Sequence, residues 1–249
     1  MIARRVRALS SLAAMVLAAA CTNSFEIPIE TPTRPKLDVT PFQRVLVAGF
    51  IAGGADDVDG NLETTRLLRS QLRTKSGLRV IDSDVLPLMD VATEGNAGAA
   101  ATPLPPIKEE KDLEAYEHLF ANVDYWQRIG EEYQQPLIVT GTVMFTPLQR
   151  NSMVQREQEV YDSFGRRRVV PVRTYMERKG FSLDGRFIFI DGRNGTTLHS
   201  ESFGEQILYN ANQTTPALSS YFELMDRLLP TFLSTLSNQK IKGTRILLQ

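Results

Sequence analysis

Arg44-Val-Leu-Val-Ala-Gly-Phe50 is the stretch from which the fold prediction starts. It is a short apolar run between turn signals, which is the pattern of a strand buried on both faces. A glycine- and aspartate-rich loop follows at 51–60, a helix with Asn61 as its N-cap is predicted to run to about Lys75, and residues 78–82 give a second strand. A strand–helix–strand unit normally makes a parallel pair with a right-handed crossover, so a parallel sheet is expected here.

Further strands are predicted on the C-terminal side of this unit. Leu137–Phe145 is a third strand that is apolar on both faces. Residues 152–178 form two polar, strand-like runs about a turn at Ser163–Arg166, and 181–208 form a second hairpin with Asp191-Gly-Arg-Asn-Gly195 as its turn. The sheet is therefore expected to change from parallel to antiparallel pairing.

Helical periodicity predicts what covers this sheet. Residues 112–133 are helical in pattern, with a possible break near Asn122, and 217–237 form an amphipathic helix in which Pro230 should produce a kink or a break. Residues 84–89 are expected to make one helical turn, and 244–248 to make a closing edge strand. The core residues expected from these patterns are Val45, Leu46, Val47, Val80, Ile138, Val139, Phe187 and Phe189, partly covered by Leu228 and Phe232.

The fold class that follows is α/β, or more strictly mixed α+β. It comprises a mixed parallel and antiparallel sheet, covering helices and a protruding β-hairpin. The single domain is predicted to span 44–249, with 152–178 as a hairpin insertion. A hydrophobic content of 42% is enough for a proper core in a chain of 249 residues.

The N-terminal residues 1–20 predict a bacterial secretory signal. Three arginines precede the apolar run Ala8–Ala20, which is shorter than the roughly 20 residues needed to cross a bilayer. Leu17-Ala-Ala-Ala-Cys21 resembles the lipobox of bacterial lipoproteins, with the leucine one place further back, and Cys21 is the only cysteine. The resemblance implies lipidation at Cys21 and a membrane anchor; ordinary cleavage after Ala20, leaving a soluble protein with a free thiol, is the alternative.

The segment 21–43 is predicted to be a lipid-anchored, Pro-rich tether. Four prolines interrupt it and would keep it extended. The alternative is that part of it lies along the surface of the domain. Thr22 follows Cys21, and by resemblance to enterobacterial sorting this favours the outer membrane, with the domain facing the periplasm.

Four stretches together resemble a known fold: RVLVAGF (44–50), TTRLLRSQLRTKSGLRVID (64–82), YQQPLIVTGTVM (133–144) and FIFIDGRNGTTLHSESF (187–203). The chain is similar over roughly 44–210 to the curli secretion lipoprotein CsgG, the TolB N-terminal domain and the LpoB-type activators of peptidoglycan synthases. The motifs are structural, so the resemblance implies the fold and leaves the branch of the family open.

No constellation in the sequence points to an enzyme or to a cofactor. The two histidines, His118 and His199, stand far apart and belong to no metal or catalytic motif. The loop 56–61 has calcium-like residue types but fails the EF-hand spacing, so a loose surface calcium site and a plain solvated loop both stay open. A net charge of −1 excludes a nucleic-acid binder on charge grounds.

The hairpin 152–178 is the candidate interaction element. It is half apolar and locally basic, which suits an envelope protein partner or a second copy of the chain; alternatively, the hairpin only extends the domain's own sheet. The candidate contact residues are Arg166, Arg167, Arg168, Val170, Val172, Arg173 and Tyr175.

The expected function is that of an outer-membrane lipoprotein that acts without catalysis in the assembly, secretion or transport of an envelope component. A regulator of a periplasmic or membrane enzyme, as the LpoB-type activators are, is the alternative. A periplasmic hydrolase with an unrecognised site is a further one.

Overall fold

The computed structural model describes residues 24–95, 107–161, 163–210, 213 and 216–248, in two compact units. The body comprises Lys36–Ser237. The second unit contains β1 (Ser24–Thr33) and β7 (Gln239–Leu248), which pair antiparallel along their whole length. The leader, Cys21 and the predictions made for them lie outside the described residues.

The terminal unit differs from the prediction in two ways. Residues 24–33 of the expected tether form a strand, and the expected closing edge strand at 244–248 pairs with that strand, in a sheet separate from that of the body. The body begins before residue 44, because Leu37 and Phe42 are buried in its core and the Leu37 N–H donates to the Thr235 carbonyl at 2.9 Å.

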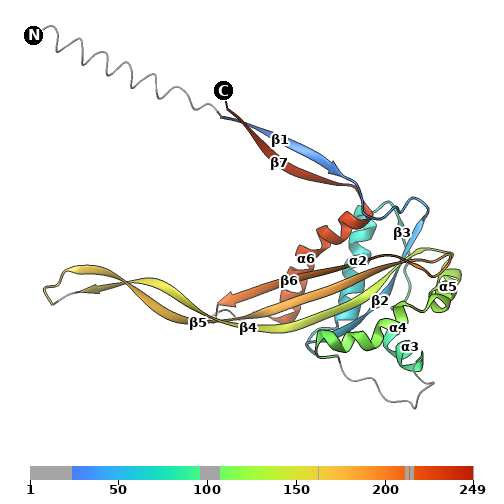
Figure 1. Cartoon of the computed structure of the whole chain (residues 1–249), viewed down its shortest axis with the longest axis horizontal. Helices are drawn as coiled ribbons and strands as arrows, with labels where there is room; N and C mark the ends of the chain where they lie inside the picture. Colours follow the sequence, from blue (N-terminus) through green and yellow to red (C-terminus); the bar gives the residue numbers. More distant parts are fainter. Residues whose placement is uncertain (1–23, 96–106, 162, 211–212, 214–215, 249) are drawn as a thin grey trace, which may run out of the picture. The chain divides into compact units, whose positions relative to one another are not determined.

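The body is built on a five-stranded sheet in the order β3-β2-β4-β5-β6 (Figure 1). The strands are β2 (Arg44–Gly54), β3 (Arg79–Val80), β4 (Leu137–Tyr161), β5 (Arg167–Asp191) and β6 (Thr197–Asn210). β2 pairs in parallel with β3 and β4, whereas β4, β5 and β6 pair antiparallel. This mixed sheet with its helices confirms the predicted fold class.

Helices cover both faces of the sheet. The two long helices pack on one face: α2 (Gly60–Lys75) and α6 (Ala217–Leu236). The shorter helices pack on the other: α3 (Leu88–Gly95), η1 (Glu110–Tyr116), α4 (Glu117–Phe120) and α5 (Val123–Glu132). None of the helices among the described residues is both long enough and apolar enough to cross a membrane.

The alternation of side chains along the central strands explains this layering. In β2, Val45 and Val47 join the core under α2 and α6, while Leu46 joins the core on the opposite face. In β4, Val139 and Ile138 divide in the same way. Apolar residues at successive positions therefore fill both layers, as expected for strands covered on both sides.

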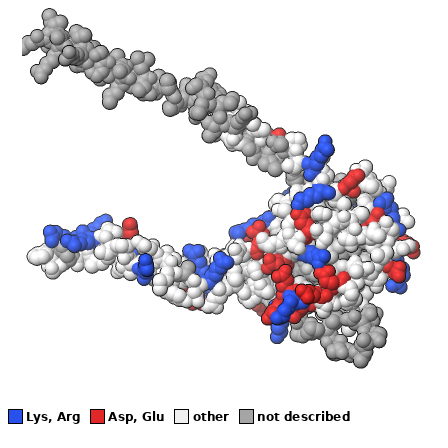
Figure 2. Space-filling model, viewed as in Figure 1, with Lys and Arg blue, Asp and Glu red and all other residues white. Residues whose placement is uncertain are grey.

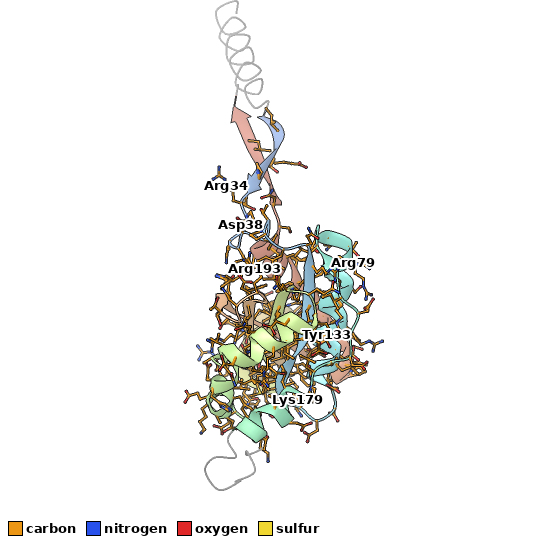
Figure 3. All side chains as sticks on the ribbon, turned by 90° about the vertical axis from the view of Figure 1, so that its right-hand side faces the viewer. Arg34, Asp38, Arg79, Tyr133, Lys179 and Arg193 are labelled. Carbon is orange, nitrogen blue, oxygen red and sulfur yellow. The ribbon has the colours of Figure 1, made fainter. Side chains whose placement is uncertain are left out.

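The residues predicted to form the core are buried, with one exception. Val80 is only partly buried, because β3 is a two-residue strand at the edge of the sheet. Figure 3 shows the side chains that fill the space between the sheet and its helices.

Two helix boundaries differ from the prediction. Asp59, not Asn61, caps α2, since its Oδ1 accepts the Leu62 N–H at 2.9 Å. Asn61 Oδ1 instead accepts the Phe50 N–H at 2.8 Å and so joins the start of α2 to β2. The helical turn expected at 84–89 lies later, as α3.

The break predicted near Asn122 is confirmed, whereas the break that Pro230 was expected to produce as one of two outcomes is not found. Asn122 marks the expected break, because its side chain caps α5 by accepting the Tyr125 N–H at 3.1 Å. α6 continues through Pro230, which is exposed and whose missing N–H removes one hydrogen bond of the helix.

The turn between β5 and β6 is fixed by Asp191. Its buried carboxylate accepts the Arg193 backbone N–H at 2.9 Å and pairs with the Arg193 guanidinium at 2.6 Å. Hydrogen bonds from Arg193 lower the pKa of Asp191, against the opposing effect of burial. The guanidinium of Arg193, labelled in Figure 3, also lies over the Phe42 ring at 4.8 Å and fixes the N-terminal segment of the body.

Candidate functional site

The strands β4 and β5 form one ladder that is longer than the rest of the sheet. They pair without interruption from Leu137–Asp191 to Tyr161–Arg167. β2 accompanies β4 only as far as Phe145, and β6 accompanies β5 only from Arg178 inward. The outer part, here called the distal ribbon (Asn151–Tyr161 and Arg167–Glu177), therefore has two free strand edges and projects from the sheet in Figure 1.

The register divides the distal ribbon into two faces. One face, here called the valine face, carries Val154, Arg156, Gln158, Val160, Arg168, Val170, Val172 and Thr174. It has no acidic residue. The opposite face carries Met153, Gln155, Glu157, Glu159, Tyr161, Arg167, Val169, Pro171, Arg173 and Tyr175, and on it Arg167 pairs with Glu159 at 2.7 Å.

The structure thus separates the candidate contact residues into two groups. Arg168, Val170 and Val172 lie on the valine face, whereas Arg167, Arg173 and Tyr175 lie on the other. Arg166 stands in the turn beside Gly165, whose φ of 71° suits a tight reversal.

Large apolar side chains are exposed along the whole distal ribbon. Phe164 in the turn is 81% exposed, and Met153 and Tyr175, which are directly opposite each other, are 74% and 61% exposed. Val160 and Val169 are also exposed. Large apolar side chains that are exposed at several neighbouring positions are typical of an interaction surface.

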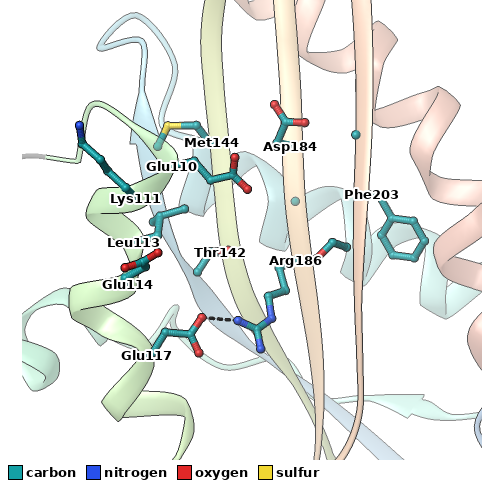
Figure 4. Close-up of a pocket in the computed structure, with 13 residues that line it drawn as sticks. Glu110, Lys111, Leu113, Glu114, Glu117, Thr142, Met144, Asp184, Arg186 and Phe203 are labelled. Carbon is teal, nitrogen blue, oxygen red and sulfur yellow. Dashed lines mark hydrogen bonds and ion pairs between the residues drawn. The ribbon is translucent and has the colours of Figure 1, made fainter.

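A pocket lies on the body where the first short helices meet the sheet (Figure 4). Its volume is about 630 Å³. Its lining comes from four parts of the chain: Glu110, Lys111, Leu113, Glu114 and Glu117; Thr142 and Met144; Asp184, Gly185 and Arg186; Ser202, Phe203 and Gly204. Residues 110–117 form one wall, and β4, β5 and β6 form the floor.

The pocket is acidic. Arg186 pairs with Glu117 and its Nε donates to Ser200 Oγ at 3.0 Å, so this cation is already engaged. Lys111 pairs with Glu109 at 2.6 Å. Among the ion pairs of the described residues, none supplies a cation to Glu110 or Glu114.

Asp184 stands on the floor of the pocket. Burial raises the pKa of its carboxyl group, and the negative charge of Glu110 raises it further, while a hydrogen bond with Ser182 opposes both. Gly204 is its register partner on β6, and a Cβ there would lie 2.6 Å from Asp184 Oδ1. Glycine at 204 therefore keeps the space above Asp184 open.

Charge is unevenly distributed between these two features. Figure 2 shows lysine and arginine side chains along the hairpin and a group of aspartate and glutamate side chains on the body. The basic residues of the hairpin are those of the distal ribbon and its turn. Several of the acidic residues line the pocket.

The remaining sequence candidates have structural roles. In the loop 56–61, Asp59 caps α2 and Asn61 binds the β2 backbone. His118 contacts the carbonyls of Ala115 and Ala92, and the described part of the chain contains no group of three His, Cys, Asp or Glu side chains placed to hold a metal ion.

No pattern in the sequence pointed to the pocket. Its only local signal is the spacing of Glu110, Glu114 and Glu117, which lie about one helical turn apart. The floor residues come from strands far apart in the sequence, so nothing in the sequence brings them together.

No family model and no curated protein matches the chain. Among solved structures, the lipoprotein GNA1162 from Neisseria meningitidis is 13% identical, with a TM-score of 0.35, covering 76% of this chain and 96% of that one. The LpoB C-terminal domain from Salmonella enterica is 8% identical, with a TM-score of 0.31, covering 67% and 84%. The PelC dodecamer from Paraburkholderia phytofirmans is 13% identical, with a TM-score of 0.36, covering 82% and 96%. Likeness of this degree carries no conclusion about function.

Proposed function

We propose that this protein is a lipid-anchored envelope protein that acts without catalysis, by docking onto another protein surface through the distal ribbon. The observation that carries the proposal is the long β4–β5 ladder, whose outer part leaves the sheet and exposes apolar side chains on both faces. The process served would be the assembly, secretion or transport of an envelope component.

The energetics of the distal ribbon support a binding role. A two-stranded ribbon is at best marginally stable alone in water. Free strand edges and exposed apolar side chains are also liabilities for aggregation. A surface such as Met153, Tyr175 and Phe164 is better explained by a partner that covers it than by a role in the fold, because these side chains bury little within the body.

The two faces suit different contacts. Valine side chains at 154, 160, 170 and 172 offer an apolar strip flanked by arginines, which can pack against another sheet or helix. The free edges can add a strand from a partner by backbone hydrogen bonds. Both modes place the contact on the ribbon and away from the body.

The membrane part of the proposal rests on the sequence. The leader 1–20 and the lipobox-like run before Cys21 support a lipid anchor, and Thr22 supports the outer membrane with the body in the periplasm. More than one acyl chain is needed for stable anchoring, and a lipoprotein N-terminus supplies this.

A regulator of a periplasmic or membrane enzyme would use the same surface, so the identity of the partner decides between the two roles. A periplasmic hydrolase, the remaining alternative, would use the pocket, because the carboxylates that line it are groups that can act as general acid or base.

Site-specific photo-cross-linking in intact cells tests the proposal. A photoreactive residue is placed at Val170 or at Tyr175, and a matched control is placed at Leu198 on β6, which is exposed to a similar degree as Val170. We expect a discrete protein adduct from both ribbon positions and none from Leu198. Adducts of equal yield at all three positions, or at Leu198 alone, would contradict docking through the ribbon.

A further inference from the structure

The terminal unit has an exposed apolar surface that docking through the distal ribbon does not explain. Its two strands, β1 and β7, pair over ten residues each and are here called the terminal ribbon (Figure 1). Ile27 and Ile29 of β1 are 42% and 38% exposed. They are two positions apart, so they share one face of the strand.

The register separates most apolar residues of the terminal ribbon from most of its charged ones. One face, here called the isoleucine face, comprises Phe25, Ile27, Ile29, Thr31, Thr33, Gln239, Ile241, Gly243, Arg245 and Leu247. The other, here called the charged face, comprises Ser24, Glu26, Pro28, Glu30, Pro32, Lys240, Lys242, Thr244, Ile246 and Leu248. Of these two sets of residues, the isoleucine face contains one cation and no acid, whereas the charged face contains two acidic and two basic residues.

The edges of the terminal ribbon are less suited to binding than its faces. β1 contains Pro28 and Pro32, and a proline has no N–H to donate to a further strand. Prolines on an edge strand are a common device that prevents pairing with another chain. A two-stranded ribbon is also at best marginally stable alone in water, so a surface that covers the isoleucine face would stabilise the pairing of its strands.

The position of Cys21 indicates which surface this is. Only two residues separate Cys21 from Ser24, the first residue of β1. Three residue steps span at most about 11 Å, so acyl chains on Cys21 would hold the start of the terminal ribbon at the bilayer surface. The two large apolar residues of the charged face, Ile246 and Leu248, lie at this same end of the ribbon.

We propose that the isoleucine face lies on the surface of the lipid bilayer, as a second membrane contact beside the lipid anchor. Apolar residues of such a face can enter the boundary between headgroups and acyl chains, and its one cation, Arg245, can bind a lipid phosphate. The charged face is then left toward water. The contact adds to the anchor and does not replace it, because binding of this kind scales with the small apolar area of one ribbon face. The inference rests on the proposed function, because lipidation of Cys21 is what brings the terminal ribbon to the membrane.

Vesicle binding by an unlipidated chain tests this contact separately from the anchor. The chain from residue 21 onward is made with Cys21→Ser, and Glu30→Cys with Lys242→Cys is added, because these two residues are opposite each other in the register. A disulfide between them reports that the strands are paired and keeps them paired. Failure of this disulfide to form would contradict the pairing on which the face depends. Flotation with vesicles of phosphatidylethanolamine and phosphatidylglycerol then gives the partition coefficient of the locked chain.

Two substitutions that each add one negative charge are compared in this disulfide-locked chain. Ile27→Glu changes the isoleucine face and Thr244→Glu changes the charged face, and both positions are exposed. We expect Ile27→Glu to lower the partition coefficient at least about tenfold, because a carboxylate would then have to leave water together with the face. The matched control, Thr244→Glu, should lie within about twofold of the locked parent chain.

Equal binding by the Ile27→Glu and Thr244→Glu chains would overturn the inference, because the contact would then lie elsewhere on the molecule. A locked parent chain that binds no vesicles, while wild-type Cys21 takes up labelled fatty acid, would also overturn it and would leave the lipid anchor intact. A parent chain that forms dimers in solution, which Ile27→Glu separates, would assign the face to a second copy of the chain and not to the bilayer. A wild-type chain that takes up no fatty acid would remove the anchor and this inference with it.

Discussion

Replacing Ile138 by alanine tests the sheet at its centre. Ile138 lies on β4, is fully buried, and has Leu46 of β2 and Ile190 of β5 as its register neighbours on the two sides. It belongs to the core that also contains Trp126. Strands cover it on both sides and helices cover it from above, so the space that it leaves has little freedom to collapse.

The expected cost follows from this burial. Isoleucine to alanine removes three carbon atoms, and at about 0.8 kcal/mol for each buried methylene the transfer part is about 2.4 kcal/mol. A residual cavity in a closely packed layer adds to this, so we expect a loss of about 3–4 kcal/mol, within the range of roughly 2–5 kcal/mol for such changes.

Urea unfolding followed by linear extrapolation measures this loss, with the slope checked for equality between variants. Val170→Ala is the matched control: it truncates an apolar strand residue of the same ladder, but one that is 36% exposed on the distal ribbon. We expect it to change the free energy of unfolding by less than about 0.5 kcal/mol. An Ile138→Ala loss below about 1 kcal/mol, or one equal to that of Val170→Ala, would refute the assignment of core and ribbon.

Three further outcomes are expected. Asp191→Asn should destabilise the body at neutral pH, because hydrogen bonds from Arg193 stabilise the charged carboxylate and lower the pKa of Asp191 in the folded state. The difference in the free energy of unfolding between wild type and variant should therefore shrink as pH falls through that pKa. Tyr221→Phe should cost about 1–1.5 kcal/mol in thermal or urea unfolding, because the buried hydroxyl bonds Thr64 and the Gly60 carbonyl. Burial raises the pKa of Tyr221, so wild-type stability should fall as pH rises above about 10, and the phenylalanine variant should show a smaller fall; equal slopes would contradict the burial. Cys21→Ala should abolish labelling by fatty acid and leave an uncut precursor or a protein released from the membrane, whereas a wild-type chain that takes up no label would contradict the anchor.

Secondary structure was predicted correctly where the local residue pattern is typical of a single structure. The apolar runs at 44–50 and 137–145 predict strands covered on both sides, and they form β2 and the inner part of β4. The turn at Asp191–Gly195 has strong signals and forms as expected. In each case the local residue types and the tertiary burial point to the same structure.

The third strand was expected to end at Phe145, yet β4 continues through Pro147 to Tyr161. The reason is that β2 stops pairing with β4 at Phe145, so Pro147 lies where β4 has one free edge and needs no second ladder partner. Pro28 and Pro32 were among the prolines that predicted an extended tether, yet they lie in β1. Both strands of the β1–β7 pair are edge strands, where proline is tolerated.

The pocket could not be predicted from the sequence. Thr142, Asp184 and Gly204 come from three strands, and only their register places them beside residues 110–117. Glycine has a low propensity for strands, so the sequence alone gives no reason for Gly204. The reason is that Gly204 pairs with Asp184, where a larger side chain would fill the space beside the carboxylate. The pairing of strands that are far apart in the sequence determines which residues line the pocket, and no local sequence pattern shows this pairing.

We propose above that the distal ribbon is an interaction element outside the core. The most direct measurement replaces Gln155–Arg173 by Asn-Gly, so that the register pair Val154 and Thr174 flanks a two-residue turn, and then measures partner recovery from cells beside the free energy of unfolding. We expect the free energy of unfolding of the shortened chain to lie within about 1 kcal/mol of the wild-type value, and we expect it to recover no partner. A shortened chain that fails to fold, or one that folds and still recovers its partner, would contradict it.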